Sequence, residues 1–409
     1  MYSISRFQQI IKPIMHGRFQ KHVQQHQADK YSKGFNCHSL LISMVYAHLT
    51  HCNSLRTLEQ SFNAHSHHHY HLNLRRRIRR STLSEALAKR DTRPFTDMPR
   101  ELMATCSRTL RKHTQDTADL LYLLDSTPII LKGRGFNQWV SSNGRISGLK
   151  VHVLMNHANG CPTVQSITEA SVNDIDQRHI VQPEKGATYV FDKGYCDYNW
   201  WAELDRAGAY FVTRLKANAA VEVIEQFSPS ETQNAHENSR NDNKNTPILT
   251  DEYIRFKHKS NSTRPNHYHN KTLRRITVER EGTEALVLVS NNLTASAQEI
   301  AENYKRRWQI ELLFKWLKQH LKLKRFLGRS ANAVKLQLLC AMMAYLLLKL
   351  YQQCTTHSND SLHLLCARIA GSLFERPQTL YAHYARRRRE RLELARMQGC
   401  CFEVKCLVC

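Results

Sequence analysis

Three carboxylates in this chain of 409 residues stand where a fold can use them for chemistry. Asp125 and Asp192 each follow a short apolar run, at the point where a buried strand delivers side chains from a rigid element. Aspartates also end strands for turn reasons, so each position alone favours a site and a turn equally. Glu311 lies in a segment with helical periodicity. Three converging carboxylates would suit a hard cation such as Mg²⁺, whereas His and Cys would select Zn²⁺.

Four polar side chains around Glu311 share one stripe of the predicted helix. At about 100° per residue the stripe is about 60° wide, and it contains Tyr304, Arg307, Glu311 and Lys318. An apolar face lies beside it, so packing on a sheet would present a carboxylate flanked by two cations and a phenol. An ordinary amphipathic helix with surface ion pairs explains the same spacing equally well.

The charge of the chain points to a polyanion as partner. The sequence has 59 Lys and Arg against 35 Asp and Glu, a formal net charge of +24. Such an excess is usually retained because nucleic acid lies against it. A dense basic run contains Arg75, Arg76, Arg77, Arg79 and Arg80. The alternative is a solvated charged face, but the sign of the whole chain favours contacts with DNA phosphates.

Other features favour a cytoplasmic protein without a membrane partner. The longest apolar stretch, Leu338 to Leu348, has 11 residues, whereas a spanning helix needs about 20. The N-terminus lacks the apolar core of a secretory signal. Twelve scattered cysteines fit a reduced compartment. The group Cys400 to Cys409 favours a free tail over a metal site, and the histidines between 65 and 71 favour a solvated loop beside DNA.

The elements that must position the acids follow from the apolar pattern. Residues 1–92 are predicted to be helical, and short apolar runs from about residue 118 predict an alternation of strands and helices, hence an α/β sheet. The predicted strands cover residues 120–124, 149–155, 162–167, 189–191 and 210–215, with helical segments at 174–181 and 200–206. Both aspartates then follow strands of this sheet.

A composition break interrupts the α/β pattern. Ser228 to Asn245 is almost wholly polar and predicts a loop. Strands are predicted around it at residues 221–227, 252–257, 273–279 and 285–290, so residues 217–292 form a β-rich insertion. Ser296 and Glu299 form a capping box that opens one long helix through about Lys322. Leu336 to Leu350 predicts a buried helix.

The spacing of Tyr304, Arg307, Glu311 and Lys318 resembles the YREK signature of the insertion-sequence-four family of bacterial DDE transposases. The segment 192–195, Asp-Lys-Gly-Tyr, is similar to the second acidic motif of that family, and 124–127, Leu-Asp-Ser-Thr, to the first. The resemblance covers about residues 118–350. Residues 1–92 more weakly resemble the helical domain that precedes the catalytic core in one branch of the family.

The resemblance implies an α/β fold with an RNase H-like catalytic core, a mixed five-stranded sheet with helices on both faces. Five segments follow: a helical N-terminal DNA-binding domain at 1–92, the first part of the core at 118–216, the β-rich insertion at 217–292, the second part of the core with the YREK helix at 293–350, and a basic helical tail at 351–409. The position of the insertion follows from composition alone and agrees with the family pattern.

The resemblance also implies the chemistry. Asp125, Asp192 and Glu311 would be the catalytic acids and would hold two Mg²⁺ ions about 3.5–4 Å apart, with Mn²⁺ as a substitute. Tyr304, Arg307 and Lys318 would hold DNA phosphates near the transposon end. Water would cut the DNA, and the liberated 3′-hydroxyl would attack the target. Pairing of two transposon ends implies a homodimer.

Tryptophan placement departs from the family pattern. Family members that cut through a hairpin are expected to hold a flipped base with a Trp in the insertion, but residues 217–292 contain no Trp. Trp308, on the predicted YREK helix, is expected to pack in the core rather than to act on a base.

Two further functions compete with a transposase. A metal-dependent DNA nuclease of the same fold would cut without rejoining. A non-catalytic DNA-binding remnant would retain only the basic regions, although the presence of all three acids argues against such decay.

Overall fold

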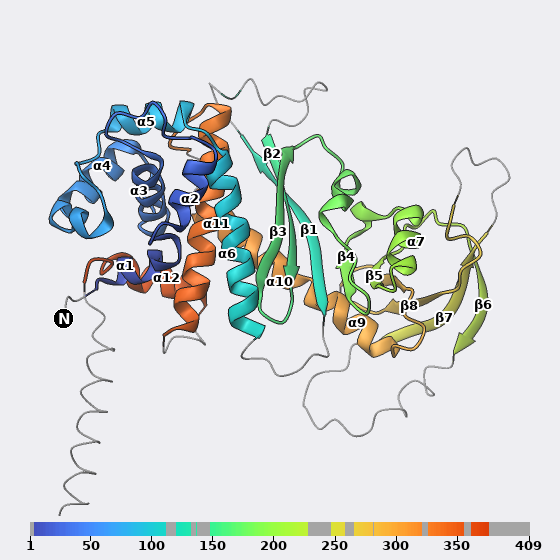
Figure 1. Ribbon diagram of the computed structural model, residues 1–409. Helices are drawn as coiled ribbons and strands as arrows, with labels where there is room; N and C mark the ends of the chain where they lie inside the picture. Colours follow the sequence, from blue (N-terminus) through green and yellow to red (C-terminus); the bar gives the residue numbers. More distant parts are fainter. Residues whose placement is uncertain are drawn as a thin grey trace, which may run out of the picture.

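The computed structural model describes residues 4–111, 120–131, 136, 148–227, 247–257, 266–280, 282–320, 326–355 and 361–375. A helical domain lies on one side of a mixed sheet, and the sheet continues away from it into the insertion (Figure 1). Helices α6 and α11 run between the helical domain and the sheet, so they join the two parts.

The N-terminal domain is helical, as the sequence predicts. Its helices are α1 (Arg6–Ile11), α2 (Arg18–Gln25), α3 (Cys37–Leu49), α4 (Leu55–Ala64), α5 (Arg80–Lys89) and α6 (Arg93–Arg111), with 3₁₀ turns at Lys12–Ile14 and Ser66–Leu72. Asn36 begins α3 by accepting a hydrogen bond from the Ser39 N–H at 2.9 Å, and Ser54 caps α4 in the same way. Helix α6 packs against α11 and the edge strand of the sheet.

The described strands form one sheet of nine in the order β3-β2-β1-β4-β5-β9-β8-β7-β6. They are β1 (Leu121–Ile130), β2 (Gly148–Asn156), β3 (Cys161–Glu169), β4 (Thr188–Phe191), β5 (Tyr210–Arg214), β6 (Val221–Phe227), β7 (Ile248–Phe256), β8 (Leu273–Val278) and β9 (Leu286–Ser290). Strands β3, β2 and β1 pair antiparallel, whereas β1, β4 and β5 pair parallel. This mixed arrangement of the first five strands confirms the RNase H-like core.

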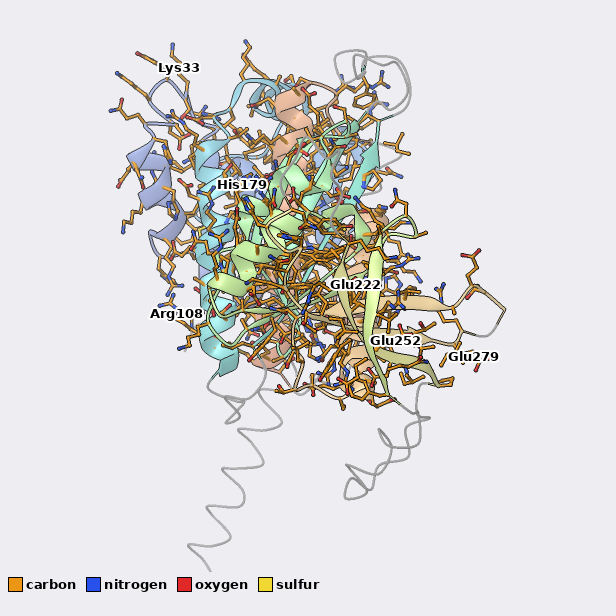
Figure 2. The ribbon with its side chains drawn as sticks, turned by 90° about the vertical axis from the view of Figure 1, so that its right-hand side faces the viewer. Lys33, Arg108, His179, Glu222, Glu252 and Glu279 are labelled. Carbon is orange, nitrogen blue, oxygen red and sulfur yellow. The ribbon has the colours of Figure 1, made fainter. Side chains whose placement is uncertain are left out.

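The insertion is continuous with the core sheet. Strand β9 pairs antiparallel with β5, and β8, β7 and β6 follow. The side chains of Glu222 and Glu252 belong to the neighbouring strands β6 and β7 at this end of the molecule, whereas Lys33 and Arg108 belong to the helical domain (Figure 2). The predicted strands are confirmed, but the five-stranded sheet and the insertion share one ladder of hydrogen bonds.

Helices cover both faces of the core sheet. Leu121 and Leu123 of β1 pack in a core with α9, α10 and α11, whereas Tyr122 and Leu124 pack in a second core with α7 (Tyr198–Arg206). Since side chains alternate along a strand, Asp125 faces the side of α10 and Ser126 faces the opposite side. The sequence prediction that β1 ends before Asp125 is wrong, because pairing with β2 continues to Ile130.

The prediction of one long helix from Ser296 to about Lys322 is wrong in one respect, because the helix is interrupted. It is divided into α9 (Ala297–Arg306) and α10 (Trp308–His320), with Arg307 between them. The Arg307 N–H bonds the Tyr304 carbonyl at 3.1 Å, and the Ile310 N–H bonds the Arg307 carbonyl at 3.1 Å. These three-residue steps tighten the turn, so angles for an unbroken helix do not apply across it. Ser296 caps α9 at the Glu299 N–H.

Helix α11 (Ala331–Gln353) is the long buried helix that the sequence predicts, extended at both ends. By length and composition it could cross a membrane, and 89% of its apolar window is buried inside the molecule. It contacts α3 and α6, as a core helix does. Helix α12 (Leu362–Ala370) follows. The predicted polar loop at 228–245, the part of the predicted basic tail after residue 375 and the cysteines at 400–409 lie outside the described residues.

The histidine segment differs from its prediction. It forms the 3₁₀ helix Ser66–Leu72, and His69 is buried against Phe62 with ring centroids 4.7 Å apart. His65 and His68 stack on Phe374, which follows α12. The prediction of a solvated loop is therefore wrong for His65, His68 and His69, because an aromatic side chain packs against each of these rings.

Candidate active site

Two of the predicted acids lie on adjacent strands. Strands β1 and β4 run parallel with Leu124 opposite Phe191, so the following residues, Asp125 and Asp192, are neighbours across the sheet. Strand β4 ends at Phe191, which places Asp192 at its carboxyl end. Parallel pairing thereby brings together two aspartates that are far apart in the sequence.

Arg307 connects the third acid to the first. Its Nη1 lies 2.7 Å from Oδ2 of Asp125, and its Nη2 lies 2.7 Å from Oε1 of Glu311. The Arg307 side chain is 17% exposed and the Asp125 side chain 16%, so the pair is largely shielded from water. The turn between α9 and α10 places Arg307 where it reaches both carboxylates.

Tyr304 and Arg214 surround Asp192. The Tyr304 hydroxyl donates a hydrogen bond to Asp192 Oδ1 at 3.3 Å, and Arg214 Nη1 lies 3.7 Å from the same oxygen. The Tyr304 ring also lies under the guanidinium of Arg307, 5.5 Å from its carbon. Sequence reasoning missed Arg214, which ends β5, because the pairing of β5 with β4 brings it to Asp192 and has no local signal in the sequence.

Burial of the site changes the protonation of Asp125 and Tyr304. Burial raises the pKa of Asp125 to about 6, and the charges of Asp192 and Glu311 add to this effect. Arg307 and the Ser126 N–H, 2.8 Å from Oδ1, oppose it. Burial also raises the pKa of Tyr304 to about 12, so this phenol stays protonated as a donor. A cation that approached Asp125 would lower its pKa again.

The donor set fits a hard divalent cation. Asp125, Asp192 and Glu311 offer oxygen ligands from two strands and a helix, as Mg²⁺ prefers. The raised pKa of Asp125 comes mainly from burial, and a bound cation would favour the charged carboxylate and oppose this effect. Within the ranges that the structure describes, no three Asp, Glu, His or Cys side chains are close enough to hold one ion, and Arg307 stands between Asp125 and Glu311.

Lys318 lies apart from the bonded group. It is exposed on α10 and, with Thr127 and Ile129 of β1, lines a small cavity. Lys318 therefore lies near the part of β1 that follows Asp125. Among the contacts that the structure describes, it forms no ion pair with the three acids.

The basic run lies in the N-terminal domain. Arg75, Arg76, Arg77, Arg79 and Arg80 are all exposed. The first three line an open groove of about 1220 Å³, together with His16, Asn36 and Tyr70. Asp29 is an acid in this groove, and it already bonds Arg90 at 3.2 Å and the Cys37 N–H at 2.8 Å. The groove is therefore a positively charged concave surface.

The prediction that Trp308 packs in the core is wrong. Trp308 is 60% exposed on α10, directly after Arg307, so it does not pack in the core. The residue that does pack is Trp316, two turns later, whose ring contacts Tyr345 of α11 with centroids 5.1 Å apart. At about 100° per residue, Trp308 lies on the opposite side of α10 from the buried residues Ile310, Leu313 and Leu317, so the helical repeat itself accounts for its exposure.

Comparison with known proteins adds a family to this geometry. Residues 116–347 match the family described as transposase DDE domain, and residues 3–75 match a domain of unknown function, DUF4372. The solved piggyBac transposase synaptic complex with hairpin DNA covers 90% of this chain and 80% of its own, at 10% identity. The TM-score of this match is 0.45.

Similar sequences carry transposase names. A protein named as transposase y4zB, from Sinorhizobium fredii, is 40% identical over 268 residues, 66% of this chain and 70% of that protein. Another, named for insertion sequence element IS4SA of Synechocystis sp., is 28% identical over 280 residues, 66% of this chain and 71% of that protein. Since the DDE domain match spans more than half of the sequence, the chain belongs to the DDE transposase family of insertion sequences.

Proposed function

We propose that this chain is an active cut-and-paste transposase. It would hydrolyse phosphodiester bonds at the ends of its insertion sequence with Mg²⁺ and join the liberated 3′-hydroxyl to target DNA. The observation that carries this proposal is the double ion pair of Arg307, which ties Glu311 on α10 to Asp125, 182 residues before Arg307 in the chain. An ordinary surface helix would not connect these acids.

The three acids would hold the metal. Bound Mg²⁺ ions neutralise charge on the attacking and leaving oxygens of a phosphodiester. Tyr304 orients Asp192 through its hydroxyl, and its raised pKa keeps that donor protonated. The planar donors of Arg307 suit two phosphate oxygens at once, and Lys318 provides a point charge. The shielding of Arg307 and Asp125 strengthens these interactions by excluding water.

The N-terminal domain would bind the terminal inverted repeats. Residues 4–80 contain twelve Lys and Arg but only two acids, Asp29 and Glu59. The groove lined by Arg75, Arg76 and Arg77 supports contact with a phosphate backbone, and Tyr70 offers an exposed ring. We accordingly assign 1–92 to DNA binding, 118–216 and 293–350 to catalysis, 217–292 to the insertion and 351–409 to a basic tail.

A homodimer in the synaptic complex is part of this proposal, because two transposon ends must be held together before joining. A bacterial cytoplasmic location at the nucleoid belongs to it as well, since the substrate is chromosomal DNA. DNA would be the principal partner, and no membrane is required.

The proposal is tested with Asp192→Ala and Glu311→Gln in cleavage and strand-transfer assays on DNA that carries the element's ends. We expect both variants to lose cleavage and to retain end binding, because the acids lie away from the groove. Glu302→Gln, an exposed glutamate of α9, is the matched control and should remain active. Cleavage by either acid variant would remove that residue from the metal site.

The same assays separate the competing functions. Cutting without joining by the wild-type protein would favour the nuclease. Binding of the ends with neither reaction would favour a DNA-binding remnant. A transposase joins a 3′ end to a second DNA molecule, and that product is absent from both alternatives.

A further inference from the structure

A second polar cluster lies behind the acids, on the opposite face of the sheet from Arg307. Its centre is Asp174, at the start of the 3₁₀ helix Asp174–Ile180. The Ser126 hydroxyl donates to Asp174 Oδ1 at 2.6 Å, and Lys150 Nζ of β2 lies 3.1 Å from the same oxygen. Ser126 directly follows Asp125, so Asp174 holds β1 at the residue beside the first acid.

Asp174 also fits closely against the second acidic motif. A Cβ atom added to Gly194 would lie 2.7 Å from Asp174 Oδ2, which is closer than such contacts allow. Gly194 belongs to the turn after β4, and that turn is closed by the Tyr195 N–H bonding the Asp192 carbonyl at 3.0 Å. Glycine at this position therefore lets the carboxylate approach the backbone that carries Asp192.

Neighbouring side chains brace the cluster. Lys150 also donates to the Val172 carbonyl at 2.7 Å, which holds the segment before Asp174 against β2. His152 is fully buried, with Nδ1 3.3 Å from the Tyr195 hydroxyl and Nε2 3.0 Å from the Thr168 hydroxyl. Strands β2 and β3 are thus linked to the turn after Asp192 by bonds that do not involve the acids themselves.

We propose that Asp174 is a positioning residue that sets the separation of Asp125 and Asp192. It contacts the residue after the first acid and the turn after the second, while Lys150 balances its charge and anchors it to the sheet. Asp174 would thereby determine how tightly Asp125 and Asp192 hold a divalent cation. This inference rests on the proposed function, because it assigns a regulator of the affinity of that same site.

The test measures cation binding as well as activity. Full-length Asp174→Ala is titrated with Mn²⁺ by calorimetry, and cleavage of end-containing DNA is measured against Mg²⁺ concentration. We expect metal affinity to fall by about 10- to 100-fold, as for other residues that orient ligands, and end binding to stay unchanged. Asp176→Asn is the control, because this exposed acid lies on the same 3₁₀ helix.

A second pair of variants tests the contact from its other side. Gly194→Ala should weaken Mn²⁺ binding in the wild-type background, because its methyl group displaces Asp174 or the turn. In the Asp174→Ala background the same substitution should have a much smaller effect, because the clash is gone. Equal effects in both backgrounds would overturn the proposed contact. If Asp174→Ala does not fold, Asp174→Ser replaces it throughout, because its shorter side chain also removes the atom that contacts residue 194, and it should show the same direction.

The outcomes separate the two proposals. If the wild-type protein binds Mn²⁺ and Asp174→Ala binds it equally well, the positioning role is overturned and the metal site stands. If the wild-type protein binds no Mn²⁺ with or without end DNA, the proposed function fails, and the positioning role fails with it.

Discussion

Replacing Asp125 with Asn should abolish cleavage and stabilise the protein at neutral pH. Burial raises the pKa of Asp125 from 3.8 to about 6, so the folded state holds this proton more tightly than the unfolded state. The protonated Asp125 carboxyl therefore stabilises the folded state. This stabilisation is fully present below about pH 4 and is lost as the pH rises through about 6. That rise in pKa corresponds to a loss of about 3 kcal/mol.

Asparagine has nearly the same shape and carries no charge, so the variant avoids this loss. The remaining cost is a weaker contact with Arg307, which keeps its bond to Glu311 and can still donate to the amide oxygen. We therefore expect the free energy of unfolding at pH 8 to rise by about 2–3 kcal/mol relative to wild type. At pH 4 the two proteins should differ much less.

The measurement is urea unfolding followed by tryptophan fluorescence at pH 4 and pH 8, with divalent metals chelated. Asp176→Asn, which removes an exposed carboxyl, should change stability by no more than about 0.5 kcal/mol at either pH. Adding Mg²⁺ should stabilise the wild-type protein and leave Asp125→Asn unchanged, because only the carboxylate helps to hold the ion. An equal increase in the free energy of unfolding of Asp125→Asn at both pH values, or a decrease at pH 8, would refute the electrostatic reasoning.

Two predictions concern other parts of the molecule. Replacing the arginines of the run Arg75–Arg80 with Ala should reduce the dependence of end binding on salt. The slope of log affinity against log salt concentration should fall by about 0.9 for each DNA phosphate that the variant no longer neutralises. An unchanged slope in salt-titrated binding assays would indicate that these arginines form a solvated face. Trp308→Ala should hardly alter the urea midpoint, because the ring is 60% exposed, whereas Trp316→Ala should cost about 3–5 kcal/mol for its buried ring. Similar losses in both variants would contradict this difference.

Local pattern predicted much of the fold. The apolar runs predicted the strands because a buried strand needs consecutive apolar side chains, and β4, β5 and β6 lie where the sequence indicated. The composition break at 228–245 falls between β6 and β7 in the sequence. Pairing was not predictable in the same way, because the bond between β5 and β9 joins segments that carry no shared local signal.

The residues of the candidate site also differ in how far local sequence could predict them. Spacing indicated that Arg307 and Glu311, four residues apart, lie on one side of the helix. Tyr304 lies across the break between α9 and α10, so the tighter turn, and not a fixed helical repeat, sets its place beside Arg307. Arg214 and Asp174 had no such repeat to reveal them, and both approach the acids only because strands and turns from other parts of the chain pack beside them.

The sequence by itself determined the residue types, the helical spacing around Glu311, the positive charge and the approximate strands, because each depends on neighbours along the chain. Only the tertiary structure decided that Arg307 bonds both Asp125 and Glu311, that Asp125 lies inside β1 rather than at its end, and that Asp174 braces the sheet from behind. These facts depend on strand register and side-chain packing between distant segments, which local periodicity does not encode.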